Sequence, residues 1–207
     1  MTIRAIEGQP GAQLVIISGP SGVGKDTIIE AMQRRQPSHP RHYVVTVTTR
    51  ARRPNEIAGV SYHFLSPEDY RRLDAAEGLL EASEVHGYCY GTPRDQVQSA
   101  LSSGRDAILK IDVQGADKVR AAVPAALLIF VVPPSLEELD ARLVGRSTER
   151  PRDLEIRRHN AALELARQDE YDHVVVNETD RVDETAEQID AIINAEHERF
   201  PDRRIRV

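Results

Sequence analysis

The sequence contains one cysteine, Cys89, in 207 residues, so it cannot encode a disulfide framework. A lone thiol favours a reducing compartment. The sequence also has no apolar run of membrane-spanning length and no stretch near its start that resembles a signal peptide. We therefore expect a cytoplasmic protein with no membrane partner. The net charge of -6 gives no support to a nucleic-acid partner either.

Lysine is also scarce: Lys25, Lys110 and Lys118 are the only three, and arginine supplies the remaining positive charge. The planar guanidinium of arginine binds phosphate bidentately, although a compositional bias of the genome would give the same pattern. The cysteine and the histidines lack the spacing of metal ligands, so no zinc site is predicted. The length suits one domain with inserted subdomains.

A glycine-rich stretch near the N-terminus is the most informative motif. It follows a branched aliphatic run at 14–17, which predicts a buried strand, and it opens a helix predicted at 24–36. Because loop amides, a helix N-terminus and a lysine all attract anions, this order predicts a phosphate site rather than an accidental surface turn. The residues of the predicted loop are Gly19, Pro20, Ser21, Gly22, Val23, Gly24 and Lys25.

The residue after the lysine departs from the P-loop pattern. That pattern continues with Ser or Thr, whose hydroxyl binds magnesium, whereas Asp26 follows here and Thr27 comes next. A carboxylate is also a good Mg²⁺ ligand. Without a metal it would repel a phosphate about 4 Å away by roughly 4 kcal/mol at an effective dielectric of about 20. We therefore expect Asp26 to bind Mg²⁺, directly or through water.

The remaining sequence alternates predicted strands with predicted helices, which indicates an α/β fold with a parallel sheet flanked by helices. Strands are predicted at 42–49, 106–112, 127–132 and 173–176, and helices at 66–78, 93–103, 135–144, 154–168 and 183–199. Between 44 and 93 the rhythm changes to short strands and a single helix, so we expect an inserted small mixed α/β lobe. Residues 86–92 are predicted to form a turn, and the basic tail after 200 is predicted to be disordered.

Further motifs follow the glycine loop in a recognisable order. They are Val47-Thr48-Thr49-Arg50, Arg53 with Glu56, Gly59 with Tyr62-His63-Phe64, Glu81, Tyr90-Gly91-Thr92-Pro93, Ile111-Asp112-Val113-Gln114-Gly115-Ala116, Arg142-Leu143, Arg146 and Tyr171-Asp172 through Asn177. With these motifs, residues 14–177 resemble the guanylate kinases, a family of nucleoside monophosphate kinases with a P-loop. The set is far more specific than the glycine loop alone.

The resemblance implies an enzyme that phosphorylates GMP to GDP, with ATP as co-substrate, Mg²⁺ as cofactor and dGMP as a weaker acceptor. It implies a P-loop core at 1–43, 94–145 and 159–207, a GMP-binding acceptor lobe at 44–93 and a lid at 146–158. ATP binding is assigned to residues 19–27 and to Asn177. The implied catalytic residues are Lys25, Arg50, Arg53, Arg142, Arg146 and Arg158.

The resemblance also implies a GMP site. Its residues are Thr46, Arg50, Arg53, Tyr62, Glu81, Tyr90, Thr92 and Asp112. Guanine carries an N1–H and a 2-amino donor that a carboxylate can accept, and a buried donor left unpaired costs about 1–3 kcal/mol. Without the resemblance, these residues have structural interpretations that stay open. Glu81 is then a surface acid on a strand edge, and Arg50 and Arg53 belong to a solvated basic loop.

Other positions keep more than one interpretation. Asp112 ends a predicted strand and is implied to face the metal or the acceptor, and Lys110 lies on the same side of that strand. Lys110 stands where the family often has an acid, and three interpretations of it stay open: an ion pair with Asp112, a contact with a phosphate, or packing of its aliphatic stem. Ser147 replaces the usual glycine of the lid, and the lid arginines alternatively form ion pairs along a helix. Asn177 contacts adenine or ends a strand in a turn.

Two rival functions are compatible with parts of the sequence. A ribose 1,5-bisphosphate phosphokinase is favoured by Asp26, because that related family carries Lys-Asp-Ser in its glycine loop. A non-catalytic guanylate-kinase-like binding module for phosphopeptides is disfavoured by the intact glycine loop. The sequence leaves the oligomeric state open, and a homo-oligomer is compatible with it.

Overall fold

The computed structural model describes residues 6–85, 87–145 and 151–207. At its centre is β1 (Leu14–Ser18), a fully buried strand of branched aliphatic residues. A five-stranded parallel sheet surrounds it in the order β2-β7-β1-β8-β9. The other strands are β2 (Arg41–Tyr43), β7 (Asp106–Lys110), β8 (Leu127–Val132) and β9 (His173–Val176). The predicted parallel α/β fold is therefore confirmed.

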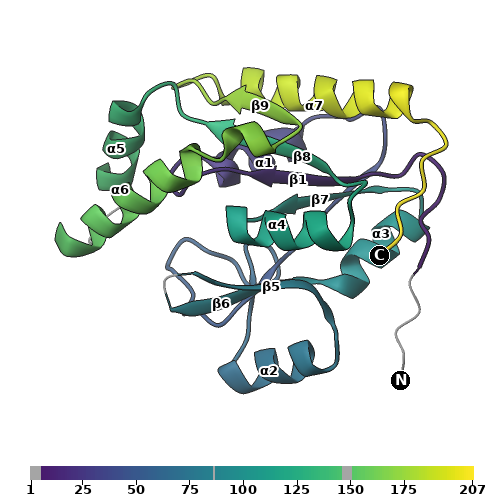
Figure 1. Ribbon diagram of the computed structural model, residues 1–207, viewed down its shortest axis with the longest axis horizontal. Helices are drawn as coiled ribbons and strands as arrows, with labels where there is room; N and C mark the ends of the chain where they lie inside the picture. The colour runs from purple at the N-terminus through teal and green to yellow at the C-terminus, as the bar shows by residue number, and fades with distance from the viewer. Residues whose placement is uncertain (1–5, 86, 146–150) are drawn as a thin grey trace.

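Helices cover both faces of this sheet, as alternation of side chains along β1 requires. On one face, Val15 and Ile17 pack with α1 (Lys25–Arg34) and α7 (Val182–Arg199). On the other, Leu14 and Ile16 share a core with α3 (Arg94–Ser102) and α4 (Val113–Ala122). Figure 1 shows α7 above the sheet and α4 below it.

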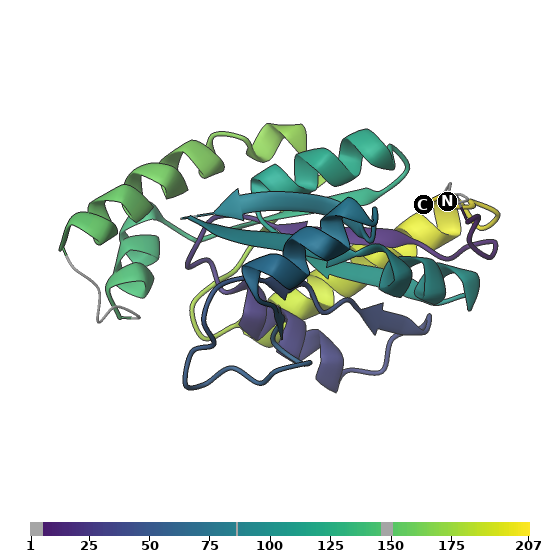
Figure 2. The ribbon, with the colours of Figure 1, turned by 90° about the horizontal axis from the view of Figure 1, so that it is seen from below.

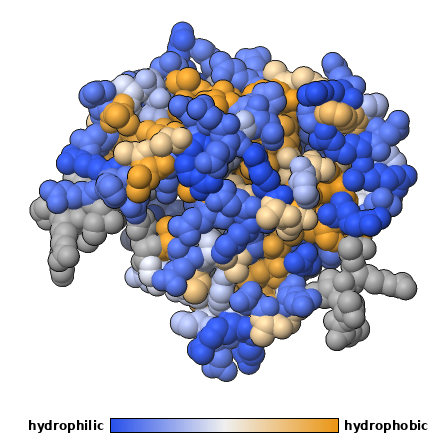
Figure 3. All heavy atoms as spheres, in the orientation of Figure 1, coloured by the Kyte–Doolittle hydropathy of each residue, from blue (hydrophilic) through white to orange (hydrophobic). Residues whose placement is uncertain are grey.

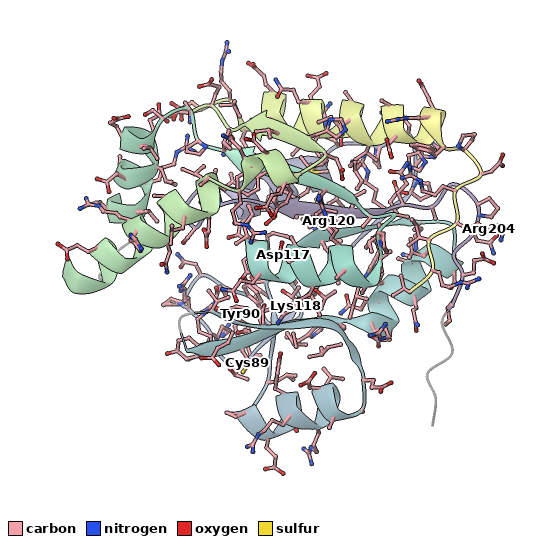
Figure 4. All side chains as sticks on the ribbon, viewed as in Figure 1. Cys89, Tyr90, Asp117, Lys118, Arg120 and Arg204 are labelled. Carbon is pink, nitrogen blue, oxygen red and sulfur yellow. The ribbon has the colours of Figure 1, made fainter. Side chains whose placement is uncertain are left out.

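A second, four-stranded sheet lies beyond α4 in the order β4-β3-β6-β5. Its elements are β3 (Val47–Thr48), β4 (His63–Phe64), α2 (Pro67–Ala75), β5 (Leu79–Val85) and β6 (Tyr88–Pro93). Its small core is formed by Val47, Tyr70 and Leu79. Seen from below, this sheet and α2 lie in front of the core (Figure 2). Lys118 of α4 points toward it and donates to the Ala82 carbonyl (Figure 4).

The single strand predicted at 42–49 is wrong, because the chain changes sheets within it. β2 ends at Tyr43 in the core sheet, and β3 begins at Val47 in the second sheet. Between them, the Val45 amide donates to Gln96 Oε1 and the Val45 carbonyl accepts from Gln96 Nε2, each at 3.0 Å. Gln96 lies in α3, just after the chain returns from β6 to the core. The outgoing and returning connections are thus joined by one side chain.

Two helices extend from the core next to the glycine loop. They are α5 (Leu136–Gly145) and α6 (Pro151–Leu165), with the short 3-10 helix η1 (Gln168–Glu170) after them. Leu139 and Leu143 of α5 pack with Ala161 and Leu165 of α6. Figure 1 shows this pair at the left of the molecule.

Three further local predictions are wrong. Helix α4 directly follows Asp112, where no helix was predicted, and of the described residues in the predicted turn only Gly87 lies in a turn, whereas 88–92 belong to strand β6. The tail predicted to be disordered is ordered: Ile205 and Val207 are buried, and backbone hydrogen bonds join them to Gly8 and Ile6. Their apolar side chains cover the outer edge of the α3 core, which explains the order.

Hydrophilic side chains cover much of the face in Figure 3, with apolar groups scattered between them. In the described part of the chain, no helix has both the length and the apolar character needed to cross a membrane.

Candidate functional site

The glycine loop joins β1 to α1 at the carboxyl edge of the core sheet, where ligands of open α/β sheets bind. Gly19 and Gly24 have φ values of 143° and 101°, a region that suits glycine. A Cβ on Gly19 would lie 2.3 Å from the Val131 carbonyl oxygen, and one on Gly24 would lie 2.6 Å from Asn177 Nδ2. The loop therefore needs glycine for its conformation and for its close packing.

Lys25 folds back over this loop. Its ammonium donates to the carbonyl oxygens of Gly19 and, at 3.1 Å, Pro20. Burial lowers the pKa of Lys25, and the carboxylate of Glu164 is the strongest opposing influence. The Ser21 amide donates to Glu164 Oε2 at 3.2 Å. An acidic side chain of α6 is thus bound by the loop predicted to bind phosphate.

Arg142 and Asn177 hold the loop from outside. Arg142 donates to the carbonyl of Val23 at 3.3 Å, the carbonyl of Asn177 at 3.1 Å and the hydroxyl of Thr179 at 2.8 Å. The buried Asn177 amide donates to the Val23 carbonyl at 2.7 Å and accepts from Thr185 at 3.2 Å. Both residues are therefore next to the loop, and their contacts with ATP stay predictions.

Of the other two predicted catalytic arginines of this region, only Arg158 is described by the structure, and it does not contact the loop. Arg146 lies outside the described residues. Arg158 makes a bidentate ion pair with Asp140 of α5, with Nη2 2.7 Å from Oδ2. This ion pair joins two helices, whereas the alternative that the sequence left open was a pair along a single helix.

A second group of residues lies in the lobe sheet. Arg50 donates to the Tyr90 hydroxyl at 3.1 Å and pairs with Glu56 at 2.6 Å, and its guanidinium lies 5.6 Å from the centre of the Tyr62 ring. The Arg53 amide donates to the other Glu56 oxygen at 2.8 Å. Tyr90 lies on β6 in Figure 4. The structure thus brings Arg50, Tyr62 and Tyr90 together, with Arg53 on the same loop.

Glu81 of β5 is a buried carboxylate, only 5% exposed. Its Oε1 accepts from the Thr92 hydroxyl at 2.9 Å, while Oε2 is buried and makes no hydrogen bond within the described part of the chain. Burial raises the pKa of Glu81 to about 7; Asp112 adds to the rise, and the nearby Thr92 and Ser83 hydroxyls oppose it. A buried acceptor with one unpaired oxygen is suited to a ligand with two donors.

Asp112 begins helix α4, where its Oδ1 accepts from the Gly115 amide at 2.8 Å. A Cβ on Gly115 would lie 3.1 Å from Glu81 Oε2 and 3.4 Å from Asp112 Oδ1, so the helix N-terminus packs against both carboxylates. Thr46, like Thr92, is buried. The predicted base-binding residues are therefore mostly internal, and the surface-acid interpretation of Glu81 is wrong.

Lys110 forms an ion pair with Asp26, which is neither of the partners that the sequence suggested. Asp26 lies in the first turn of α1 with its side chain 58% exposed. In the described residues, no three His, Cys, Asp or Glu side chains are close enough to hold a metal together. Mg²⁺ takes most of its ligands from phosphates and water in such sites, so one exposed carboxylate fits a metal that arrives with ATP.

The sequence analysis assigned no role to Glu164, and it named Glu56 only as part of a motif. Glu56 had a local signal, because it follows the basic loop closely in sequence. Glu164 had none: it is one of many acids on a long helix, and 143 positions separate it from the amide that it binds.

These features define a class. A glycine loop at the end of a central parallel strand, opposed by a lobe that holds arginine, tyrosine and a buried carboxylate, is the arrangement of a P-loop kinase with a separate acceptor site.

Comparison with known proteins gives the family within this class. The guanylate kinase family model matches residues 11–196. Guanylate kinases of Thermobifida fusca and Gloeobacter violaceus are 44% and 43% identical to the chain, covering 88% and 94% of it and 91% and 92% of those proteins. The crystal structure of guanylate kinase from Anaplasma phagocytophilum has a TM-score of 0.73 at 32% identity, covering 91% of this chain and 88% of that one. The chain belongs to the guanylate kinase family.

Proposed function

We propose that this protein transfers the γ-phosphoryl group of ATP to GMP, giving ADP and GDP. The observation that carries the proposal is the buried Glu81 carboxylate, with an unpaired oxygen, on the same lobe as Arg50, Tyr62 and Tyr90. The Glu81 carboxylate is suited to guanine, and Arg50 with the two tyrosines is suited to a phosphate. A site for a guanine nucleotide as acceptor needs both kinds of group.

Glu81 selects the base. Its carboxylate accepts from N1–H and the 2-amino group of guanine, with the Thr92 hydroxyl and Thr46 beside it. Adenine offers no donor at N1 or C2, so a bound adenine would leave the buried acceptor unpaired at a cost of about 1–3 kcal/mol. The lobe therefore favours GMP over AMP, while dGMP acts as a weaker acceptor.

Arg50 and Arg53 bind the GMP phosphate, assisted by the hydroxyls of Tyr62 and Tyr90. Arg50 forms an ion pair with Glu56 at 2.6 Å. The phosphate replaces one anion with another, so a guanidinium that is only 11% exposed is never left without a counter-charge.

The glycine loop binds the phosphates of ATP through its amides and Lys25, and Asp26 binds the Mg²⁺ that accompanies them. The metal supplies positive charge to the phosphate oxygens. Arg142, Arg146 and Arg158 approach the nucleotide when the lid closes, and Asn177 lies on the adenine side. The attacking GMP oxygen is already ionised, so the enzyme needs no general base, and catalysis comes from positioning and charge.

A coupled ADP-release assay with GMP, dGMP, AMP and UMP as acceptors tests the proposal, with Lys25→Ala as the inactive control. We expect strong turnover of GMP, weaker turnover of dGMP and little with AMP or UMP. Ribose 1,5-bisphosphate is included because Asp26 favours that rival acceptor; activity on the sugar phosphate alone would reverse the assignment. Binding of a phosphopeptide without binding of ATP would support a non-catalytic module instead.

A further inference from the structure

The ion pair between Lys110 and Asp26 lies where the donor and acceptor sites meet. Lys110 is the last residue of β7 and is aligned with Ile17 of β1, two residues before the glycine loop. Asp26 immediately follows Lys25 at the start of α1. The Lys110 side chain is 20% exposed and that of Asp26 58%. The ammonium is therefore held at the entrance of the loop, within reach of a ligand.

Lys110 also contacts the acceptor side. Its ammonium lies 5.1 Å from the centre of the Tyr62 ring, and the Arg50 guanidinium lies 5.6 Å from the same centre. One aromatic ring thus attracts two cations, a geometry that orients both of them. Through this ring, Lys110 is placed next to the group that binds the acceptor phosphate.

Lys110 contacts the donor side as well. Its ammonium forms an ion pair with Asp26, the residue that directly follows Lys25 of the glycine loop. The ammonium groups of Lys110 and Lys25 are thus held at adjoining positions of the site. Two like charges brought together are unfavourable until anions enter between them.

We propose that Lys110 is a catalytic residue that binds the transferring phosphoryl group between the two nucleotides, and that Asp26 positions it there before they bind. The inference rests on the proposed function. In the transfer, an oxygen of the GMP phosphate forms a bond to the γ-phosphorus as the bond from that phosphorus to the bridging oxygen breaks, and ADP leaves with the electron pair. Lys110 keeps its proton throughout and neutralises charge on the equatorial oxygens.

If the ion pair between Lys110 and Asp26 were purely structural, the double variant would be expected to behave differently. If Lys110 served only to neutralise Asp26, removing both charges would restore activity, since neither group would be left unpaired. If Lys110 binds the phosphoryl group, its loss is not repaired by removing Asp26. The double variant therefore separates the two roles.

The experiment compares Lys110→Gln, Asp26→Ser and the double variant with the wild-type protein. The control is Asp183→Asn. Asp183 lies in α7 and forms an exposed ion pair with Arg34, which lies in α1 like Asp26. Steady-state rates are measured together with the affinity, in the absence of metal, for a bisubstrate analogue in which adenosine and guanosine are linked by five phosphates. Lys110→Met, which keeps the apolar stem, replaces Lys110→Gln if that variant is unstable.

We expect Lys110→Gln to lower kcat and the affinity for the analogue by about 10- to 150-fold, the loss of one charge-assisted hydrogen bond. The separate affinities for ATP and GMP should change by less than about threefold, because neither nucleotide alone holds a phosphoryl group between the donor and the acceptor. The double variant should stay as impaired as Lys110→Gln, and the control should match the wild type.

A double variant with wild-type kcat would overturn the inference, as would a Lys110→Gln variant that binds the analogue normally. Both results leave GMP turnover by the wild-type protein intact, so the proposed function would survive them. A wild-type protein without GMP turnover would overturn the proposed function and this inference with it.

Discussion

Replacing Glu81 with Gln changes one buried oxygen to an amide and removes a negative charge at constant shape. Glu81 is 5% exposed, and burial raises its pKa to about 7 from the ordinary 4.5. Between these two pH values, the folded protein holds a proton that the unfolded chain releases. The contribution of this group to stability is therefore fully present below about pH 4.5 and is lost as the pH rises through about 7.

The size of the effect follows from the difference between the two pKa values, which corresponds to about 3 kcal/mol of folding free energy. Glu81→Gln has no proton to lose. Compared with the wild type, the variant should therefore gain up to about 3 kcal/mol in stability between pH 5 and pH 8. Its affinity for GMP should fall about 10- to 150-fold, because the amide presents a donor toward guanine N1–H and its 2-amino group.

Denaturant unfolding at pH 5 and pH 8 measures the first effect, and kcat/KM for GMP measures the second. Glu84→Gln is the matched control: Glu84 lies on the same strand but is exposed. A stability difference between wild type and Glu81→Gln that does not change with pH would refute the assigned pKa. An unchanged kcat/KM for GMP would refute the assignment of Glu81 to guanine.

Three further substitutions test the rest of the site. Arg50→Gln should raise KM for GMP about 10- to 150-fold. Arg52→Gln, on the exposed part of the same loop, should change KM by less than about threefold. Equal effects of the two substitutions in steady-state assays would contradict a specific phosphate contact of Arg50. Glu164→Gln should tighten ATP binding by about threefold to tenfold in a calorimetric titration, because a carboxylate no longer competes for the loop amide; weaker binding would mean that Glu164 assists the nucleotide. Gly19→Ala should lower the free energy of unfolding by at least about 2 kcal/mol, because its Cβ meets a backbone oxygen. Gly59→Ala, with open space around the new Cβ, should lower it by about 1 kcal/mol. Similar losses in denaturant titrations would show that packing at Gly19 is unimportant.

The glycine loop could be predicted because its signal is local. The strand, the loop and the start of the helix are consecutive, and residues 14–34 contain every residue that defines them. Glu81 is different, because its position in sequence says nothing of its burial. The resemblance assigned it a role, but the packing of Gly115 against its carboxylate joins two segments that the sequence leaves apart.

The wrong predictions share a cause in tertiary structure. The run at 42–49 has one uniform β-branched pattern, yet the chain passes from one sheet to another inside it. Helix α4 begins at Val113, and its N-cap Asp112 lies in the run at 106–112 that was interpreted as strand, although β7 itself ends at Lys110. The order of the tail depends on burial of Ile205 and Val207 against a distant helix. None of these follows from local preference.

Partners distant in sequence account for the unexpected site contacts. Asp26 and Lys110 are 84 positions apart, and each departs from the family pattern by itself. Considered singly, Asp26 indicated a metal ligand, and Lys110 indicated a pair with Asp112, a phosphate contact or simple packing. Only the structure shows that the two departures meet.

The double hydrogen bond between Gln96 and Val45 has a mechanical consequence for the acceptor lobe. Two strand connections joined at one point behave as a single pivot rather than as two independent tethers. We expect any movement of the lobe against the core to turn about this point. A Gln96→Ala protein would lose this shared axis, so its lobe should adopt a wider range of orientations relative to the glycine loop.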